Sequence, residues 1–273
     1  MKTKMKKKMK MNLVYKDFKQ FSKYDFLIMI PSSGRVKTCN GTLGLFPHQS
    51  CLYVHEEEVE EYRKYNKDIP IVTHKVKNGY GGVVNSAIAV AKKSKIQYLM
   101  VIDDDMSIVS SLVGNRQRTL DLSKRYEAVV NAVQVMSDID VYLYLFSTSS
   151  NIIKYQQHQP YKVGFSLPQG VYIVNPQKIG IKYNESYHYY EDFDFCMEYI
   201  LKHRYYIIEQ RILMTGTNVD ALTDGGCNSH RTARNEEVSR NWIQKKWKSH
   251  CSFAKNSGGN IRPTCNAKRV ATQ

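Results

Sequence analysis

Three consecutive carboxylates, Asp103, Asp104 and Asp105, are the group in this sequence best suited to metal chemistry. They directly follow the apolar run 96–102, which predicts a buried strand, and ligands of an open α/β sheet bind at the carboxyl ends of its strands. Adjacent carboxylates repel one another, so a divalent cation with hard oxygen ligands would stabilise them. Asp103 and Asp105 share one side of an extended chain, which leaves Asp104 on the other. A solvated acidic turn at the end of a strand is the alternative interpretation.

Two further loops carry groups that suit a nucleotide. The segment 31–35 offers two hydroxyls and a planar guanidinium for a base, a ribose or a diphosphate, although a surface turn with a solvated arginine has the same composition. The segment 78–82 lacks the Gly-Lys-Ser/Thr ending of a Walker loop. Its glycines instead open a predicted helix whose exposed amides and dipole favour an anion, and a tight turn is the alternative.

An acidic pair among tyrosines is the candidate for acid–base chemistry. Glu191 and Asp192 precede a predicted helix, and Tyr187, Tyr189 and Tyr190 lie just before them. A carboxylate in aromatic surroundings can have a raised pKa and serve as a general base. The structural alternative is that Asp192 is an ordinary helix N-cap.

The C-terminal part of the chain supplies further candidates. His230 could complete a metal shell begun by the aspartates, or Arg231 could hold a phosphate, although single histidines are more often structural. Trp242 and Trp247 lie in a predicted basic helix over 231–250. They could stack on unpaired bases or anchor that helix to the core.

Short apolar runs alternate with helical stretches, which is typical of an α/β fold. Strands are predicted over 26–30, 52–54, 69–74, 96–102, 141–146, 170–174 and 205–209, the last of which closes the sheet, and helices over 56–65, 82–93, 119–137, 192–203 and 231–250. The loops after the strands then meet at one edge of the sheet and can surround one ligand. We expect a single catalytic domain, a Rossmann-type sheet flanked by helices, with a basic C-terminal appendage.

The net charge of +15 is concentrated at the two ends of the sequence. Residues 1–24 hold nine lysines against one aspartate, residues 228–273 hold ten lysines or arginines against two glutamates, and residues 25–227 are almost neutral. We therefore expect a basic extension over 1–24, a catalytic domain over 25–227, and a basic segment over 228–273 that contacts a polyanion, because phosphate contacts release counterions. Solubilising lysine-rich tails are the alternative.

Membrane and disulfide signals are weak. No run approaches the roughly 18 apolar residues of a membrane span, and the six cysteines include no C-x-x-C pair. We expect a cytoplasmic protein with free thiols and no membrane contact. The sequence makes no prediction of oligomeric state.

Taken together, the motifs resemble a known enzyme family. The chain combines the segment 31–35, the glycine-rich segment 79–85, the aspartates 103–105, the acidic loop 191–194 and Gly225-Gly226-Cys227. This set is similar to GT-A-fold glycosyltransferases, and within them to the TET/J-binding-protein-associated branch of phages and eukaryotes, which glycosylates hydroxymethylated pyrimidines in DNA. The resemblance runs from about Phe26 to Arg231. It departs at Val84, where that branch would have an arginine before Asn85, so Arg35 or Arg231 becomes more important for the diphosphate.

The resemblance implies metal-dependent, inverting transfer of a sugar from a UDP-sugar to 5-hydroxymethylcytosine or 5-hydroxymethyluracil in double-stranded DNA. Asp103, Asp105 and His230 would hold Mg²⁺ or Mn²⁺. Asp192, assisted by Glu191, would take the proton of the acceptor hydroxyl, and the target base would leave the stack. The residues expected to contact the donor are Pro31, Ser32, Ser33, Arg35, Gly81, Gly82, Asn85, Asp103, Asp104 and Arg231.

Three other functions stay open on the sequence alone. A GT-A glycosyltransferase acting on a glycan, a protein or a small molecule would keep its catalysis after both basic ends are trimmed. A nucleotidyltransferase also uses metal-bound carboxylates but would transfer a nucleotide. A non-catalytic nucleic-acid-binding protein would bind DNA and turn over no sugar nucleotide.

Overall fold

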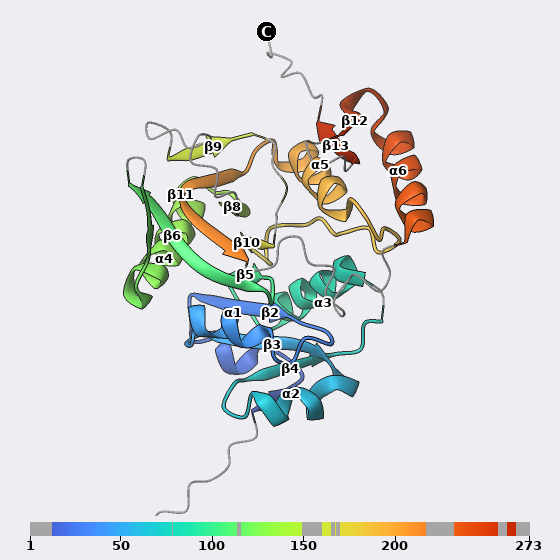
Figure 1. Cartoon of the computed structure of the whole chain (residues 1–273). Coiled ribbons are helices and arrows are strands. Elements are labelled where there is room, and N and C mark those ends of the chain that lie inside the picture. Colours follow the sequence, from blue (N-terminus) through green and yellow to red (C-terminus); the bar gives the residue numbers. More distant parts are fainter. Residues whose placement is uncertain are drawn as a thin grey trace, which may run out of the picture.

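An eleven-stranded mixed sheet forms the centre of the molecule, with helices on both of its faces (Figure 1). The computed structural model describes residues 13–77, 79–113, 116–148, 160–164, 167, 170–216, 232–255 and 261–265. The predicted α/β architecture, a sheet flanked by helices, is confirmed.

Five parallel strands make the first half of the sheet. In spatial order they are β1 (Val14–Tyr15), β4 (Ile71–His74), β3 (Ser50–His55), β2 (Phe26–Pro31) and β5 (Tyr98–Ile102). Continuous apolar runs form β2 and β5 because both faces of these strands are covered, which removes the alternation of a half-exposed strand. All neighbours in this half are parallel, so their carboxyl ends share one edge of the sheet.

The second half is mixed and brings two strand starts to that same edge. It continues with β10 (Val171–Val174), β8 (Leu143–Ser147), β11 (Ile207–Gly216), β6 (Met106–Val113) and β7 (Arg116–Thr119), while β9 (Tyr161–Val163) pairs with β11. β10 is antiparallel to β5, and β6 is antiparallel to β11. The first residues of β10 and β6 therefore lie at the edge where β2, β5 and β11 end.

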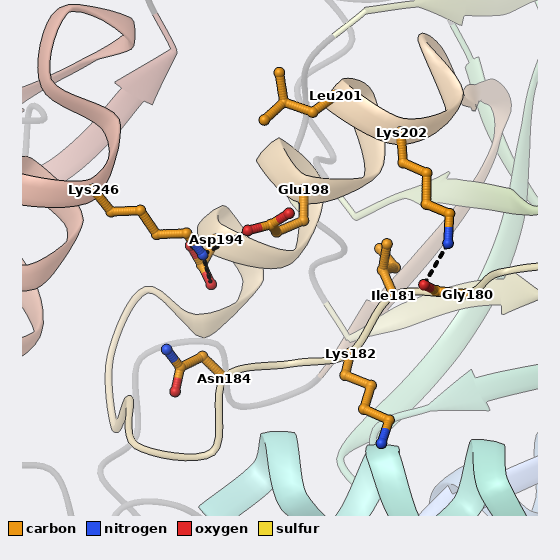
Figure 2. Close-up of a pocket in the computed structure, with 9 residues that line it drawn as sticks. All are labelled: Gly180, Ile181, Lys182, Asn184, Asp194, Glu198, Leu201, Lys202 and Lys246. Atoms are coloured by element: carbon orange, nitrogen blue, oxygen red, sulfur yellow. Dashed lines mark hydrogen bonds and ion pairs between the residues drawn. The ribbon is translucent and has the colours of Figure 1, made fainter.

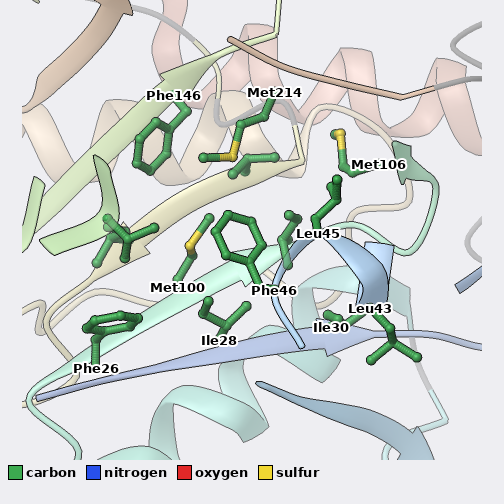
Figure 3. Packing of buried hydrophobic residues seen from close by; sticks show 14 of the residues in the cluster. Phe26, Ile28, Ile30, Leu43, Leu45, Phe46, Met100, Met106, Phe146 and Met214 are labelled. Carbon is green, nitrogen blue, oxygen red and sulfur yellow. The ribbon is translucent and has the colours of Figure 1, made fainter. Parts of the chain in front are cut away.

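The helices cover the sheet in two layers. They are α1 (Cys39–Leu45), α2 (Val59–Tyr65), α3 (Gly79–Lys93), α4 (Leu122–Asp138), α5 (Glu191–His203) and α6 (Ala233–Trp247), with short 3₁₀ helices η1 (Lys19–Phe21), η2 (Glu56–Glu58) and η5 (Lys248–His250). Side chains of α1, α2 and α4 fill the core on one face, part of which Figure 3 shows, and side chains of α3 and α5 fill the core on the other. Asp121 and Thr232 cap α4 and α6, because each side chain accepts a backbone N–H of the first turn.

The C-terminal unit consists of α6, η5 and the hairpin of β12 (Cys251–Lys255) and β13 (Ile261–Cys265), and it packs on α5 (Figure 1). A third apolar cluster fills this contact and contains Tyr187, Phe193, Met197, Ile243, Trp247 and Cys251. Beside it, Lys246 Nζ lies 2.7 Å from Oδ1 of the buried Asp194 and 2.7 Å from Oε1 of the more exposed Glu198 (Figure 2). The Trp247 indole N–H donates to Asp194 Oδ1 (2.8 Å). Of the two roles considered for the tryptophans, anchoring is the one that Trp247 has.

Several elements differ from the predicted ones. Residues 207–209 of the strand predicted over 205–209 lie inside the sheet, between β8 and β9, so the prediction that this strand closes the sheet is wrong. The structure also contains α1, β1, β6, β7, β9 and the C-terminal hairpin, which the sequence analysis does not predict. Among the described helices, none combines the length and apolarity that a membrane crossing requires.

Candidate active site

The three aspartates occupy a tight turn between β5 and β6. The Met106 amide donates to the Asp103 carbonyl (3.4 Å), and the Asp103 amide donates to the Gly170 carbonyl just before β10 (2.8 Å). The Thr42 hydroxyl of α1 hydrogen-bonds to the carbonyls of Asp103 (3.1 Å) and Met106 (2.8 Å). The chain reverses directly after β5, so the extended geometry that would put Asp103 and Asp105 on one side is absent.

Asp104 is the buried member of the turn, only 5% exposed. Ser32, which follows β2, donates a hydrogen bond to Asp104 Oδ2 (2.5 Å) and lies 2.6 Å from the Tyr62 hydroxyl of α2. Arg35 Nη1 donates to Asp104 Oδ1 (3.0 Å). Burial raises the pKa of Asp104 above its ordinary value, although the hydrogen bonds from Ser32 and Arg35 oppose the rise. Asp104 thus joins the segment 31–35 to the acidic turn.

Arg35 also faces the more accessible carboxylate of the turn. Its Nη1 lies 3.6 Å from Asp105 Oδ2, and the Asp105 side chain is 29% exposed. Burial alone would lower the pKa of Arg35, but the nearby aspartates raise it above its ordinary value, so the guanidinium is charged. Arg35 Nε is buried without a hydrogen-bond partner among the described residues. An oxygen that enters beside Asp105 would satisfy this N–H.

Glycines in neighbouring strands make room for the acidic turn. Gly170 has a φ of 77°, and a Cβ there would come 2.5 Å from Asp103 Oδ2 and 2.8 Å from Met106 Cε. A Cβ at Gly216, the last residue of β11, would come 3.1 Å from the Asp105 carbonyl oxygen. The position of the Asp103 carboxylate therefore depends on the absence of a side chain at Gly170.

The second acidic segment opens α5. The helix begins at Glu191 and its N-cap is Tyr190, so the interpretation of Asp192 as the N-cap is wrong. Tyr190 has a φ of 61°, which is uncommon for a residue with a Cβ. Its hydroxyl hydrogen-bonds to Glu236 of α6 (2.6 Å) and to the Ile261 carbonyl of β13 (3.2 Å). The C-terminal unit thus holds the residue directly before the acidic pair.

Three tyrosine hydroxyls form a hydrogen-bonded cluster. Tyr183 donates to the Tyr172 hydroxyl (3.0 Å), and the Tyr80 hydroxyl lies 3.3 Å from it. Burial raises the pKa of Tyr80 well above its ordinary value, and the negative charges of Asp103 and Asp192 add to the rise. Burial raises the pKa of Tyr172 in the same way, again with a contribution from both carboxylates. Asp103 and Asp192 are therefore close enough to the same pair of hydroxyls to influence both.

The glycine-rich segment packs α3 against the chain that carries Tyr183. A Cβ at Gly81 would lie 2.9 Å from the Tyr183 Cβ, and Gly82 is also buried. The Asn85 amide donates to the Tyr183 carbonyl and to Glu185 Oε1, both at 2.9 Å, and accepts the Tyr183 N–H at 2.9 Å. Packing and hydrogen bonds within the fold are enough to explain Gly81, Gly82 and Asn85 at these positions. Their predicted contact with a sugar donor stays a prediction.

Other predicted residues lie at the rim or outside the described part. Pro31 is the last residue of β2, and the Ser33 hydroxyl donates to the partly buried Glu58 carboxylate (3.0 Å). His230, Arg231 and the segment 224–227 lie outside the described residues. Within the described ranges, no group of three or more histidine, cysteine, aspartate or glutamate side chains is arranged to hold a metal. The predicted third metal ligand therefore stays a prediction.

Sequence reasoning missed several residues that build the site, among them Thr42, Tyr62, Gly170 and Tyr172. Gly170 is the first residue of a predicted strand and Tyr172 lies inside that strand, so a glycine followed by an apolar run was the available signal. Thr42 and Tyr62 lie on helices, where nothing in the local sequence distinguishes a tertiary hydrogen bond from a solvated hydroxyl.

A cavity of about 450 Å³ lies beside α5, away from the acidic turn (Figure 2). It is lined by Gly180, Ile181, Lys182, Asn184, Asp194, Glu198, Leu201, Lys202 and Lys246. Lys202 Nζ donates to the Gly180 carbonyl (2.6 Å), and Lys246 is neutralised by Asp194 and Glu198. No residue of the acidic turn or of the segment 31–35 lines this cavity, so it is separate from the candidate active site.

Comparisons with known proteins identify a family. The family model of TET-associated glycosyltransferases matches residues 26–221. No curated protein matches the chain. Similar solved structures include mannose-1-phosphate geranyltransferase from Thermus thermophilus (12% identity, 70% of this chain and 76% of that chain, TM-score 0.47) and a protein from Desulfovibrio desulfuricans named as a nucleotide-diphospho-sugar transferase (8% identity, 80% and 98%, TM-score 0.37). Similarity this distant supports no conclusion about substrate.

Proposed function

The chain belongs to the TET-associated glycosyltransferase family, and from this premise we propose that it transfers a sugar from a UDP-sugar to the hydroxymethyl group of a modified pyrimidine in DNA. The acceptor would be 5-hydroxymethylcytosine or 5-hydroxymethyluracil. The observation that carries the proposal is the family match over residues 26–221. The hydrogen bonds that join Asp104 of the acidic turn to Ser32 and Arg35 support a donor site at the carboxyl ends of β2 and β5.

On the donor side, Asp103 and Asp105 would hold Mg²⁺ or Mn²⁺. Their oxygens suit a hard cation, and Mg²⁺ is commonly bound by one or two carboxylates together with substrate phosphates. With phosphate oxygens as further ligands, these two carboxylates would be enough to hold such an ion. When bound, the ion would neutralise the departing diphosphate. Arg35, with its buried unpartnered Nε, would donate to a diphosphate oxygen beside Asp105.

On the acceptor side, Asp192 would remove the proton of the hydroxymethyl group as its oxygen attacks the anomeric carbon. Glu191 is buried at the start of the same helix, directly before Asp192, and would assist it. The bond from the anomeric carbon to the diphosphate breaks as the new bond forms, so attack from the opposite face gives inversion. The strained Tyr190 backbone, fixed through Glu236, would orient this pair.

The test is mass spectrometry of nucleosides from duplexes that contain either modified base, incubated with the protein, Mn²⁺ and a panel of UDP-sugars. We expect a hexose or pentose on one base, dependent on metal. Asp105→Ala should abolish it, and Asp192→Asn should lower kcat about 10²- to 10⁴-fold. Metal-dependent hydrolysis of a UDP-sugar without any DNA product would reject DNA as the acceptor, and transfer of a nucleotide would reject the glycosyltransferase chemistry.

A further inference from the structure

The outward surface of α6 is basic. Arg234, Val238, Asn241 and Lys245 recur at helical spacing and are all exposed, and the buried stripe of Ser239, Ile243 and Trp247 lies on the opposite side of the helix. The neighbouring segments of the C-terminal unit add three exposed cations, Lys248, Lys255 and Arg262. Within the described residues, none of these five cations forms a salt bridge. The carboxylates of Asp194 and Glu198 pair with a different lysine, Lys246.

Trp242 stands at the border of this basic surface. The helical positions put it between the outward residues Val238 and Lys245 and the buried Ile243. It is 45% exposed, whereas Trp247 is 6% exposed. Its indole lies 5.6 Å from the ring of the buried Tyr187 at an interplanar angle of 58°. One side of the indole is therefore supported, while a large part of it is open to a ligand.

This surface is attached to the helix that carries the proposed base. Tyr187, under Trp242, lies five residues before Asp192, and Glu236 of α6 holds the hydroxyl of Tyr190. The buried Asp194 of α5 binds both Lys246 and Trp247. A ligand held on α6 would therefore have a defined position relative to the start of α5.

We propose that the outward face of α6 contacts the phosphate backbone of DNA and that Trp242 stacks on a base that has left the duplex. This inference rests on the proposed function and names the surface that presents its acceptor. Unpaired phosphate-binding cations beside an exposed, supported aromatic ring are the combination that binds unstacked nucleic acid. A helix packed on the core is also better suited than a lysine-rich tail to place a base, because its backbone is already ordered.

The experiment is a fluorescence titration of the full chain with a short duplex that carries 5-hydroxymethyluracil opposite guanine, since a mispaired base is easier to unstack. The protein has two tryptophans, and the exposed one dominates any quenching by a stacked base. We expect quenching in the natural protein, no quenching in Trp242→Leu, and a dissociation constant raised about tenfold in that variant. Trp242→Phe should recover part of the affinity.

Tyr65→Leu is the matched control, because it removes an exposed aromatic side chain of α2 far from α6 in the sequence. It should leave affinity and quenching unchanged. An affinity of Trp242→Leu equal to that of the natural protein would overturn the inference. Unquenched emission of the natural protein on the duplex, or the absence of DNA binding by it, would overturn it as well. Quenching by a duplex that never receives sugar would sink the proposed function and leave this surface standing.

Discussion

Asp104 and Asp105 are sequence neighbours with different surroundings. Asp104 is buried and bonded to Ser32 and Arg35, whereas Asp105 is partly exposed. We expect Asp104→Ala to lower the free energy of unfolding by about 3 kcal/mol, because it leaves a buried guanidinium without its partner. Asp105→Ala should cost less than about 1 kcal/mol, because the Asp105 carboxylate is partly open to solvent and Arg35 keeps its hydrogen bond to Asp104. Urea unfolding measures both.

The two variants should also separate in activity. Asp105→Ala should fold normally and lose sugar transfer, whereas Asp104→Ala should lose stability first. If Asp105→Ala proved the less stable protein, the assignment of Asp104 as the group that holds the segment 31–35 to the turn would be wrong. Arg35→Met should partly rescue the stability of Asp104→Ala, because the unpaired charge is then gone.

A buried histidine at the end of β4 makes stability depend on pH. Burial, with a contribution from His55, lowers the pKa of His74 to about 4, so His74 is neutral in the folded protein at pH 7. Between roughly pH 6.5 and 4 the unfolded chain binds a proton at this residue and the folded chain does not, so its contribution to stability is present above pH 6.5 and lost as the pH falls. The full loss is about 3 kcal/mol at most.

The measurement is the free energy of unfolding from urea titrations at pH 7, 6, 5 and 4 for the natural protein and His74→Gln. We expect a shallower decrease in the variant over this window. Equal slopes in the two proteins would mean that other groups cause the acid sensitivity.

At the scale of elements, the strands predicted correctly are those whose apolar runs are continuous. β2 and β5 are buried on both faces of the sheet, so nearly all of their residues are apolar and the sequence identifies them as strands. β7 consists of Arg116, Gln117, Arg118 and Thr119, all exposed at the sheet edge, and its composition alone indicates a loop. The acidic turn and the loop after β2 were found because their chemistry is local. The connection of these two segments through Asp104 was not predicted. It depends on the turn after β5, which decides which of the three adjacent aspartates is buried.

The start of β10 is where an element controls the site. We expect Gly170→Ala to lower transfer at least about 100-fold, because an added Cβ meets the Asp103 carboxylate and a small displacement of a reacting group is costly. Gly180→Ala is the matched control: it also has a positive φ, of 56°, but its Cβ would meet the flexible end of Lys202. The control should lose some stability and keep its kcat. Equal kcat in both variants would argue against Asp103 as a donor ligand.

At the scale of the whole molecule, the C-terminal unit is part of the packed structure. Removing it would uncover Phe193 and Met197 on α5, the helix that begins with Glu191 and Asp192, and would leave Asp194 without its partners. Loss of catalysis after truncation would therefore say nothing about DNA. Substitutions that change charge and keep the packing are the appropriate test.

Arg234→Gln combined with Lys245→Gln is such a test, because both side chains are exposed on α6 and away from the buried stripe. Each lost phosphate contact should reduce the magnitude of the slope of log K against log [salt] by about 0.9. The double variant should therefore bind DNA with a slope smaller in magnitude by about 2. Lys92→Gln with Lys93→Gln makes the same charge change at the exposed end of α3 and should leave the slope unchanged. Equal reductions in both double variants would mean that net charge, and not the face of α6, attracts the DNA.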